Sequence, residues 1–548
     1  MQVRMLLFIP GFAVAVGCAT VKPRASAERL HPRDKVVCAD WKEAPNAWYV
    51  DANFYEIFVR SFQDSDGDGI GDFDGLIERL DYLNDGDPNT QTDLGVSALW
   101  LMPINSSPSY HGYDVTDYRS IAAEYGGMAA FQRFLKAAHA RGIRVVMDLV
   151  VNHTSSQHPW FVKGKRGPQQ STFDYYHFRD SPLDWTQPWN TSSPTWHPLG
   201  KRYFYGLFWG GMPDLNFKNP AVRREMLDVA QYWLDLGVDG FRLDAARYLV
   251  ENGKGLQADQ PGTHHFWRSL RTLTNRHGGT PLLVGEAWTD NKRAVQYFGD
   301  GDELHMLFGF DRASGLRRGI SSHRASILKD AICEELDSRP AVGWFGSFAT
   351  NHDMDRIATI LGASSSVSRL ALVGKLLFAM PGTPFIYYGQ ELGLLNGPGR
   401  GDPEKRMPMR WDDGNGNGFT SAATAWAMDD KNENTPSVAR QVNDPKSLLT
   451  VYRQMAHLRS TVPALRRGAT VVVDVGYQDQ VLAFARILEG DLVLVVANVA
   501  DEPVSLKLPL GALGWNELKF TGLVGTYQDP HAEIRMAAAE VSIWHSRH

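Results

Sequence analysis

The chain lacks several features that would assign it to a specialised class of protein. Long runs of basic residues are missing from its 548 residues and its formal net charge is −6, which argues against nucleic acid as a partner, because phosphate binding needs a basic surface. Short-period repeats and low-complexity tracts are also missing, so the chain is not built as a repeat array. Only three cysteines occur, so at most one disulfide can form within the chain.

An apolar run at the N-terminus reads as a targeting segment. Arg4 precedes MLLFIPGFAVAVG (5–17), which is too short to span a bilayer permanently. The run ends in AVGC at Cys18, which resembles a bacterial lipobox with Ala15 where leucine is usual. We predict a signal peptide over 1–18, a polar tether over 19–45, and export as an outer-membrane or cell-surface lipoprotein anchored through Cys18. Plain secretion is the alternative.

Two cysteines then remain, Cys38 and Cys333. In an exported protein they form one disulfide or stay as two buried thiols, and the sequence leaves both open.

The body of the chain alternates strand-like and helical segments. A regular strand–helix alternation predicts a parallel sheet of the α/β class, and eight units favour a closed (β/α)₈ TIM barrel, with an open doubly wound sheet as the alternative. Between the candidate strands lie segments with apolar spacing near 3.6 residues. The eight candidate strands are 53–62, 96–104, 143–151, 238–246, 281–288, 305–311, 343–353 and 383–391.

Two regions depart from this alternation. Residues 153–212 are rich in Trp, Tyr, Pro and His with little helical period, so we predict an inserted subdomain after the third strand. Residues 468–548 are β-rich with turn signals and predict a C-terminal antiparallel β-sandwich. The barrel domain would then comprise residues 46–152 and 213–467.

Charged residues recur at the ends of the predicted strands. In VDGFRLDAARYL (238–249), Arg242 and Asp244 share one face of an otherwise apolar strand. Asp148 and Asn152 lie on one face at the end of the third strand. Glu286 follows the fifth strand, and His352 and Asp353 follow the seventh. Active sites of barrels lie at the C-terminal strand ends, so four such ends indicate one catalytic rim rather than an isolated structural ion pair.

An ordered set of motifs carries a family resemblance. DLVVNH (148–153), GFRLDAARY (240–248), GEAW (285–288) and FATNHD (348–353) resemble the signature regions of the α-amylase family, glycoside hydrolase family 13. GYDVTDY (112–118), MPDLN (212–216) and GTPFIYYGQELG (382–393) are further similarities.

The resemblance implies a retaining glycosidase mechanism with three catalytic carboxylates. Asp244 would be the nucleophile, Glu286 the general acid/base, and Asp353 the carboxylate that grips sugar hydroxyls. Arg242 would hold Asp244 ionised, and partial desolvation would raise the pKa of Glu286. The resemblance also implies substrate-binding roles for Tyr113, His111, His153, Arg242 and His352.

DSDGDGIGDFDG (64–75) predicts a calcium loop. Its oxygen ligands would be those of Asp64, Asp66, Asp68, the Ile70 carbonyl and Asp72. It is not an EF-hand, because Gly75 stands where that motif needs glutamate; a similar loop occurs in relatives of the oligo-1,6-glucosidase type. A second calcium near Asn152 stays open, because Arg247-Tyr248 replace the Lys-His usual in many α-amylases.

Within the family, MPDLN (212–216) resembles the group between oligo-1,6-glucosidases and neopullulanases, which includes lipoprotein α-amylases. RMPMRWDDGNGNGF (406–419) is closer to glucosidases and trehalose synthases. Exo-acting glucosidases carry an acidic residue three positions before the platform tyrosine, and here that residue is Tyr110.

We therefore expect an endo-acting, monomeric α-amylase that cleaves α-1,4 bonds in starch and maltooligosaccharides with Ca²⁺ bound. The alternatives are an exo-glucosidase, a cyclomaltodextrinase, a glucosyl-transferring enzyme, and a non-catalytic barrel of the same fold. A non-catalytic barrel would lack the catalytic carboxylates of the family, and those carboxylates are present here.

Overall fold

A computed structural model describes residues 30–32, 34–362, 367–427, 432, 435–477, 479–525 and 527–547. The predicted signal peptide, Cys18 and the first part of the tether lie outside these residues. Within the described part of the chain, no helix combines the length and apolar character needed to cross a membrane.

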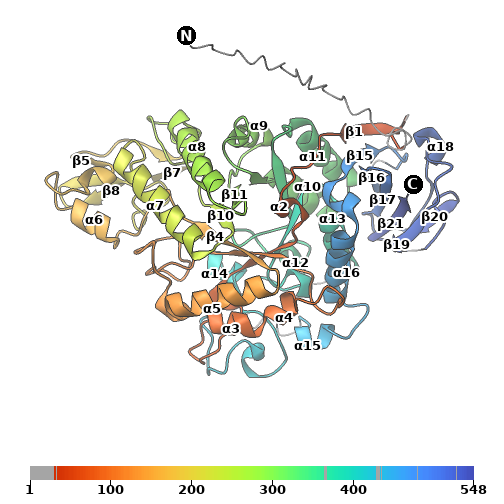
Figure 1. Ribbon diagram of the computed structural model, residues 1–548, viewed down its shortest axis with the longest axis horizontal. Coiled ribbons are helices and arrows are strands. Elements are labelled where there is room, and N and C mark those ends of the chain that lie inside the picture. Colours follow the sequence, from red (N-terminus) through yellow and green to blue (C-terminus); the bar gives the residue numbers. More distant parts are fainter. Residues whose placement is uncertain are drawn as a thin grey trace, which may run out of the picture.

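Eight parallel strands close into a barrel at the centre of the molecule (Figure 1). The closed order confirms the TIM barrel and excludes the open sheet. Nearly every strand position is buried, as expected for parallel strands covered on both faces. The strands are β2 (Phe54–Ile57), β3 (Ala98–Leu101), β4 (Arg144–Leu149), β10 (Gly240–Leu243), β11 (Leu282–Gly285), β12 (Met306–Phe308), β13 (Trp344–Phe348) and β14 (Thr383–Tyr387).

Amphipathic helices surround the barrel and bury one face each. Local signals define their ends: α7 (Pro220–Leu236) begins after Asn219, whose side chain accepts the Ala221 N–H, and ends at Gly237, which adopts φ 105°. The other long helices are α5 (Gly127–Ala140), α8 (Pro261–Arg276), α10 (Phe310–Ser321), α11 (Ala325–Ser338), α13 (Val367–Ala379) and α16 (Leu448–Thr461).

The insertion follows β4, as predicted, and forms small antiparallel sheets at one end of the molecule (Figure 1). β5 and β8 pair with β9, while β6 pairs with β7. Its elements are α6 (Pro159–Gly164), the 3₁₀ helix η3 (Phe173–Tyr175), β5 (Phe178–Arg179), β6 (Thr186–Gln187), β7 (Asn190–Pro194), β8 (Trp196–Leu199) and β9 (Arg202–Tyr205).

The C-terminal region forms an antiparallel sandwich. A six-stranded sheet in the order β1-β15-β16-β17-β21-β19 lies over the pair β18-β20, and apolar residues of both sheets form one core cluster. The strands are β15 (Ala469–Val473), β16 (Val481–Leu488), β17 (Asp491–Asn498), β18 (Val504–Lys507), β19 (Thr521–Val524), β20 (Glu533–Met536) and β21 (Glu540–Arg547).

The N-terminal strand of this sheet corrects one expectation. β1 (Val36–Asp40) lies within the region predicted as a tether, yet it pairs antiparallel with β15. Leu30 is fully buried in the sandwich core, where its carbonyl accepts the Trp515 indole N–H. The tether prediction is therefore wrong for this part, because apolar positions within a polar segment contact residues about 430 to 485 positions later in the chain.

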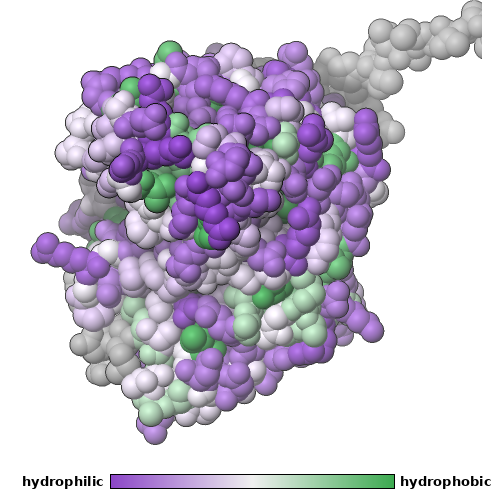
Figure 2. Space-filling model, turned by 90° about the vertical axis from the view of Figure 1, so that its left-hand side faces the viewer, coloured by the Kyte–Doolittle hydropathy of each residue, from purple (hydrophilic) through white to green (hydrophobic). Residues whose placement is uncertain are grey.

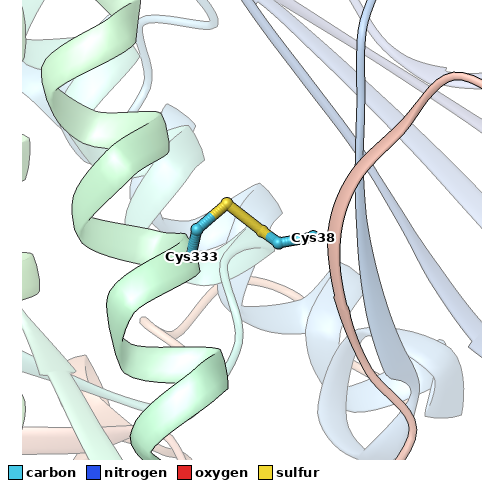
Figure 3. The surroundings of a disulfide bond; sticks show 2 residues. All are labelled: Cys38 and Cys333. Atoms are coloured by element: carbon cyan, nitrogen blue, oxygen red, sulfur yellow. A yellow bond between two sulfur atoms is a disulfide. The ribbon is translucent and has the colours of Figure 1, made fainter.

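A disulfide joins the same strand to the barrel (Figure 3). Cys38 of β1 bonds to Cys333 of α11, with their Cα atoms 5.7 Å apart and 295 residues between them in sequence. Of the two alternatives that the sequence left open, the structure contains the disulfide.

This cross-link generates a stability prediction. Because a disulfide over a long loop restricts the unfolded chain, reduction should remove about 2–4 kcal/mol of stability and lower the Tm of the wild type by several degrees in a calorimetric scan. Cys333→Ser should show the lower Tm without reductant and no further drop with it. Equal Tm values for all samples would contradict a stabilising disulfide.

Candidate active site

A cavity of about 640 Å³ opens at the C-terminal ends of the barrel strands. Strand ends, the loop after β3 and the insertion all contribute to its wall. The lining residues are His111, Tyr113, His153, Trp189, Phe208, Trp209, Met212, Asp244, Ala245, Tyr248, Glu286, Trp288, Asp353, Asp402 and Arg406.

Arg242 is the centre of the charged groups. Its Nη1 lies 3.0 Å from Asp148 Oδ1 and 2.7 Å from Asp244 Oδ1, and its Nη2 lies 2.9 Å from Glu286 Oε2. Strand register brings these groups together, because Arg242 pairs with Asp148 on β4. Arg242 is 1% exposed, and three carboxylates surround its one guanidinium.

The backbone after the candidate nucleophile is also specialised. Ala245 adopts φ 48°, in the left-handed region that non-glycine residues seldom occupy. Its N–H donates to Glu286 Oε2 over 3.2 Å. This turn fixes Glu286 beside Asp244, as expected for strain kept at a functional site.

The local environment separates the protonation states of the carboxylates. Burial raises the pKa of Glu286 to about 7, with the Arg242 charge opposing and the Asp244 charge reinforcing the shift. Burial likewise raises the pKa of Asp148. A carboxyl group that keeps its proton near neutral pH can donate it to a leaving group.

Asp353 has the opposite shift. Burial raises its pKa, but the His352 and Arg406 charges outweigh burial and hold that pKa well below its usual range. His352 Nε2 lies 3.1 Å from Asp353 Oδ2, and His352 Nδ1 lies 2.6 Å from Glu56 Oε1. Burial lowers the pKa of His352, while Asp353 and Glu56 raise it overall to about 9. Asp353 is thus an ionised acceptor suited to sugar hydroxyls.

The remaining predicted binding residues lie around the same cavity. The Tyr113 hydroxyl is 2.7 Å from His352 Nε2 and donates to Asp148 Oδ2 over 3.1 Å. His153 Nε2 lies 3.2 Å from the Tyr113 carbonyl. His111 lines the cavity, and its Nδ1 accepts the Tyr113 N–H. All eight predicted catalytic and binding residues therefore lie at one site.

Sequence reasoning missed several residues of this site. Trp189 and Trp209 come from the insertion and Trp288 follows Glu286, and all three are about half exposed, at 51%, 52% and 48%. Arg406 binds Asp353 from the loop after β14, and Glu56 orients His352 from β2. The high Trp content of the insertion was a usable signal, and Arg406 begins the motif RMPMRWDDGNGNGF (406–419), whereas nothing local marks Glu56.

The acidic loop brings together part of the predicted ligand set. Carboxylate oxygens of Asp64, Asp66 and Asp72 lie within 4.8 Å of one another, a hard-oxygen set that suits a divalent cation. Asp68 lies outside this cluster, and its Oδ1 accepts the N–H of Ile70 at 2.7 Å. The residues that could hold a metal are therefore the three clustered aspartates.

The turn geometry of this loop depends on glycine. Gly67 and Gly69 adopt φ 80° and 90°, and a Cβ on Gly69 would lie 2.5 Å from the Thr424 carbonyl oxygen. The preceding element is the short β2 and a 3₁₀ turn rather than a helix, which excludes an EF-hand.

The fold and these groups define the class of protein. The (β/α)₈ barrel is closed, and Asp244 and Glu286 contact the same guanidinium as Asp148. Asp353 lies at the same cavity as an ionised carboxylate, and aromatic residues line the wall. This combination is typical of a retaining carbohydrate-processing enzyme. The carboxylates whose loss would indicate a non-catalytic barrel are all present and aligned.

Comparison with known proteins makes this assignment specific. The alpha amylase catalytic domain model matches residues 56–468. The chain is 35% identical to alpha-amylase 3 of Dictyoglomus thermophilum over 464 residues, covering 82% of this chain and 85% of that one. It is 32% identical to the trehalose synthase/amylase TreS of Mycobacterium tuberculosis over 519 residues, covering 85% and 84%. The crystal structure of an alpha-amylase from H. orenii superposes with a TM-score of 0.81 at 34% identity, covering 91% of this chain and 99% of that chain. The chain belongs to the α-amylase family, glycoside hydrolase family 13.

The shifted pKa of Glu286 generates a pH prediction. A general acid works only while protonated, so kcat/KM should fall as pH rises through about 7. The kcat/KM of Glu286→Gln should fall about 10²- to 10⁴-fold on maltooligosaccharides but much less on α-glucosyl fluoride, because kcat/KM reports formation of the glycosyl-enzyme and fluoride leaves without a proton. The measurement is a pH profile of both proteins on both substrates.

The control for this prediction is the circular dichroism spectrum of the variant, which should match the wild type. A falling limb centred near pH 9 in the wild type would instead indicate His352. A limb near 7 that persists in Glu286→Gln would show that Glu286 is not the titrating acid.

Proposed function

We propose that the protein is an endo-acting α-amylase that hydrolyses α-1,4 bonds of starch and maltooligosaccharides. The observation that carries this proposal is the open, aromatic rim of the cavity. Half-exposed Trp189, Trp209 and Trp288 offer stacking faces for several consecutive glucose units. A pocket that admits only a chain end would need a closing group on one side.

Tyr110 supports the same conclusion. It occupies the position where exo-acting relatives place an acidic cap, and its ring stacks on Trp426 at 5.5 Å with an interplanar angle of 20°. Arg406 lies over the same ring. Tyr110 is thus held in the wall, and it brings no carboxylate to the end of a glucan chain.

The proposed mechanism uses the geometry of the three carboxylates. Asp244 attacks the anomeric carbon while Glu286 protonates the glycosidic oxygen of the leaving group. Glu286 then deprotonates a water that attacks the same carbon, which breaks the bond to Asp244 and releases the sugar. Asp353 binds sugar hydroxyls, which helps distort the ring. Arg242 keeps the attacking carboxylate and the acid in fixed relative positions.

Glucosyl transfer is the second candidate activity, with exo-glucosidase and cyclomaltodextrinase action as further variants. The similarity to a trehalose synthase/amylase favours it, as does Asp402, which lines the cavity close to Arg406 and could contact an acceptor sugar. Product analysis separates these activities.

Calcium, export and assembly complete the proposal. Ca²⁺ would be held by Asp64, Asp66 and Asp72 and would stabilise the loop that leads into α3 (Phe73–Glu78). The protein would act as a monomer, exported as a lipoprotein through Cys18 or secreted.

A product time course tests the activity. On soluble starch the wild type should release mixed maltooligosaccharides early, because cleavage occurs inside chains, and Asp244→Asn should lose nearly all turnover while folding normally. The measurement is chromatography that resolves chain lengths. Glucose alone would indicate an exo-glucosidase, and trehalose or longer transfer products would indicate transfer. Near-normal starch cleavage by folded Asp244→Asn would refute the assigned nucleophile.

Chelation tests the metal. Partial desolvation and the neighbouring carboxylates of Asp68, Asp64 and Asp72 raise the pKa of Asp66, and a bound cation would relieve this repulsion. EDTA should lower the Tm by several degrees, and Ca²⁺ should restore it more effectively than Mg²⁺. Asp66→Asn should reduce the Ca²⁺-dependent part of the Tm. A Tm that responds to neither EDTA nor Ca²⁺ would exclude the site.

A further inference from the structure

A second groove lies on the insertion, outside the catalytic cavity. Its volume is about 420 Å³, and its walls come from the segment around η3 and β5, from β8, and from the loop after β10. None of its lining residues lines the catalytic cavity. The residues that matter here are Phe173, His177, Phe178, Trp185, Trp196 and Glu251.

Aromatic rings form much of this groove. Phe173 stacks on Phe178 with ring centroids 4.9 Å apart, and Trp185 meets Trp196 edge to face at 5.9 Å. Phe173, Phe178 and Trp185 are each only partly buried. The stacking covers one face of each phenyl ring and Arg202 lies over the Phe173 ring, so the exposed parts of these rings and of Trp185 supply the apolar area for contact with the C–H faces of a pyranose sugar.

Polar groups accompany the rings. His177 Nε2 lies 3.2 Å from Glu251 Oε1, and Lys218 Nζ lies 3.4 Å from the same oxygen. Trp196 is 7% exposed, yet its indole nitrogen has no hydrogen-bond partner among the described residues. Buried indole N–H groups nearly always find an acceptor, so an unsatisfied donor lies in the wall of the groove.

An aromatic cluster lies between this groove and the catalytic cavity. Trp196 packs with Tyr205 and Leu207, and the partly buried Trp185, Phe208 and Tyr248 contact that cluster. Phe208 and Tyr248 also line the catalytic cavity. The groove and the cavity therefore contact the same aromatic cluster through different lining residues, and a polymeric substrate could contact both.

The surrounding surface argues for a narrow polar ligand. The end of the molecule that carries the insertion is mainly hydrophilic, with separate small hydrophobic patches (Figure 2). A stable protein partner would need a larger continuous patch.

We propose that this groove is a second, non-catalytic binding site for an α-glucan segment. The proposal rests on the α-glucan specificity proposed above. The groove would hold a neighbouring chain of the same starch particle and raise the local concentration of cleavable bonds. Short oligosaccharides cannot occupy both sites, so the effect is specific to long substrates.

Kinetics on long and short substrates test the proposal. The variants are Trp185→Ala and Phe173→Ala, with Trp41→Ala as the matched control, because Trp41 is 40% exposed and lies outside the groove. Both groove variants should raise KM for starch about 3- to 10-fold, with kcat on starch and kcat/KM on maltotriose unchanged. Phe173→Ala is the more specific test of the two, because Trp185 also contacts the aromatic cluster next to the catalytic cavity, whereas Phe173 is not part of that cluster.

Native electrophoresis through gels containing soluble starch gives a readout independent of turnover. In an Asp244→Asn background, starch should retard the parent protein strongly, the two groove variants less, and Trp41→Ala as much as the parent. Unchanged retardation and unchanged starch KM for Phe173→Ala would overturn the proposal. An equal loss on starch and maltotriose would also overturn it, because the effect would then lie in the catalytic cavity.

The same gels separate this inference from the proposed function. If the wild type cleaves no starch but starch retards it in a Phe173-dependent way, the amylase proposal fails and the groove remains a glucan site. If the wild type cleaves starch and Phe173→Ala changes nothing, the amylase proposal stands and the groove proposal fails.

Discussion

The structure depends on one buried guanidinium. Arg242 touches Asp148, Asp244 and Glu286 at once, and it lies over the ring of Trp100 at 5.2 Å. Removing one partner of a buried ion pair typically costs about 3–5 kcal/mol, because the remaining charge stays uncompensated. Loss of Arg242 would leave three such carboxyl groups at the barrel centre. The catalytic geometry is therefore also a condition for a stable barrel.

The same buried environment shifts the pKa values of Glu286 and Asp353 in opposite directions. Glu286 loses more by desolvation than it gains from Arg242, so its pKa rises, whereas Asp353 gains enough from His352 and Arg406 that its pKa falls. Pairs of titratable groups whose pKa values diverge in this way mark the acid and base roles of an enzyme. Glu56 contributes indirectly, because it contacts His352 and, together with Asp353, raises the pKa of that histidine.

Contacts with the helices around the barrel explain how the rest of the chain attaches. Arg486 of β16 donates to the carbonyls of Ala379 and Met380 at the C-terminal end of α13, where the helix dipole favours a cation. The Cys38–Cys333 bond and β1 fasten the N-terminal segment to the same region. The sandwich thus packs against α11 and α13 on the outside of the barrel and contributes no residue to the lining of the catalytic cavity.

The sequence by itself determined the fold class, the eight barrel strands, the insertion, the C-terminal sheet and a set of candidate site residues that the structure brings together at one cavity. It could do so because buried parallel strands read as continuous apolar runs, and because charges within them, such as Arg242 and Asp244, stand out locally. Only the tertiary structure decided the pairing of Cys38 with Cys333, the place of β1 in the sandwich, the exclusion of Asp68 from the acidic cluster, and the roles of Glu56 and Arg406. These depend on contacts between residues far apart in the chain, and such contacts leave no periodic or compositional trace in the segments that make them.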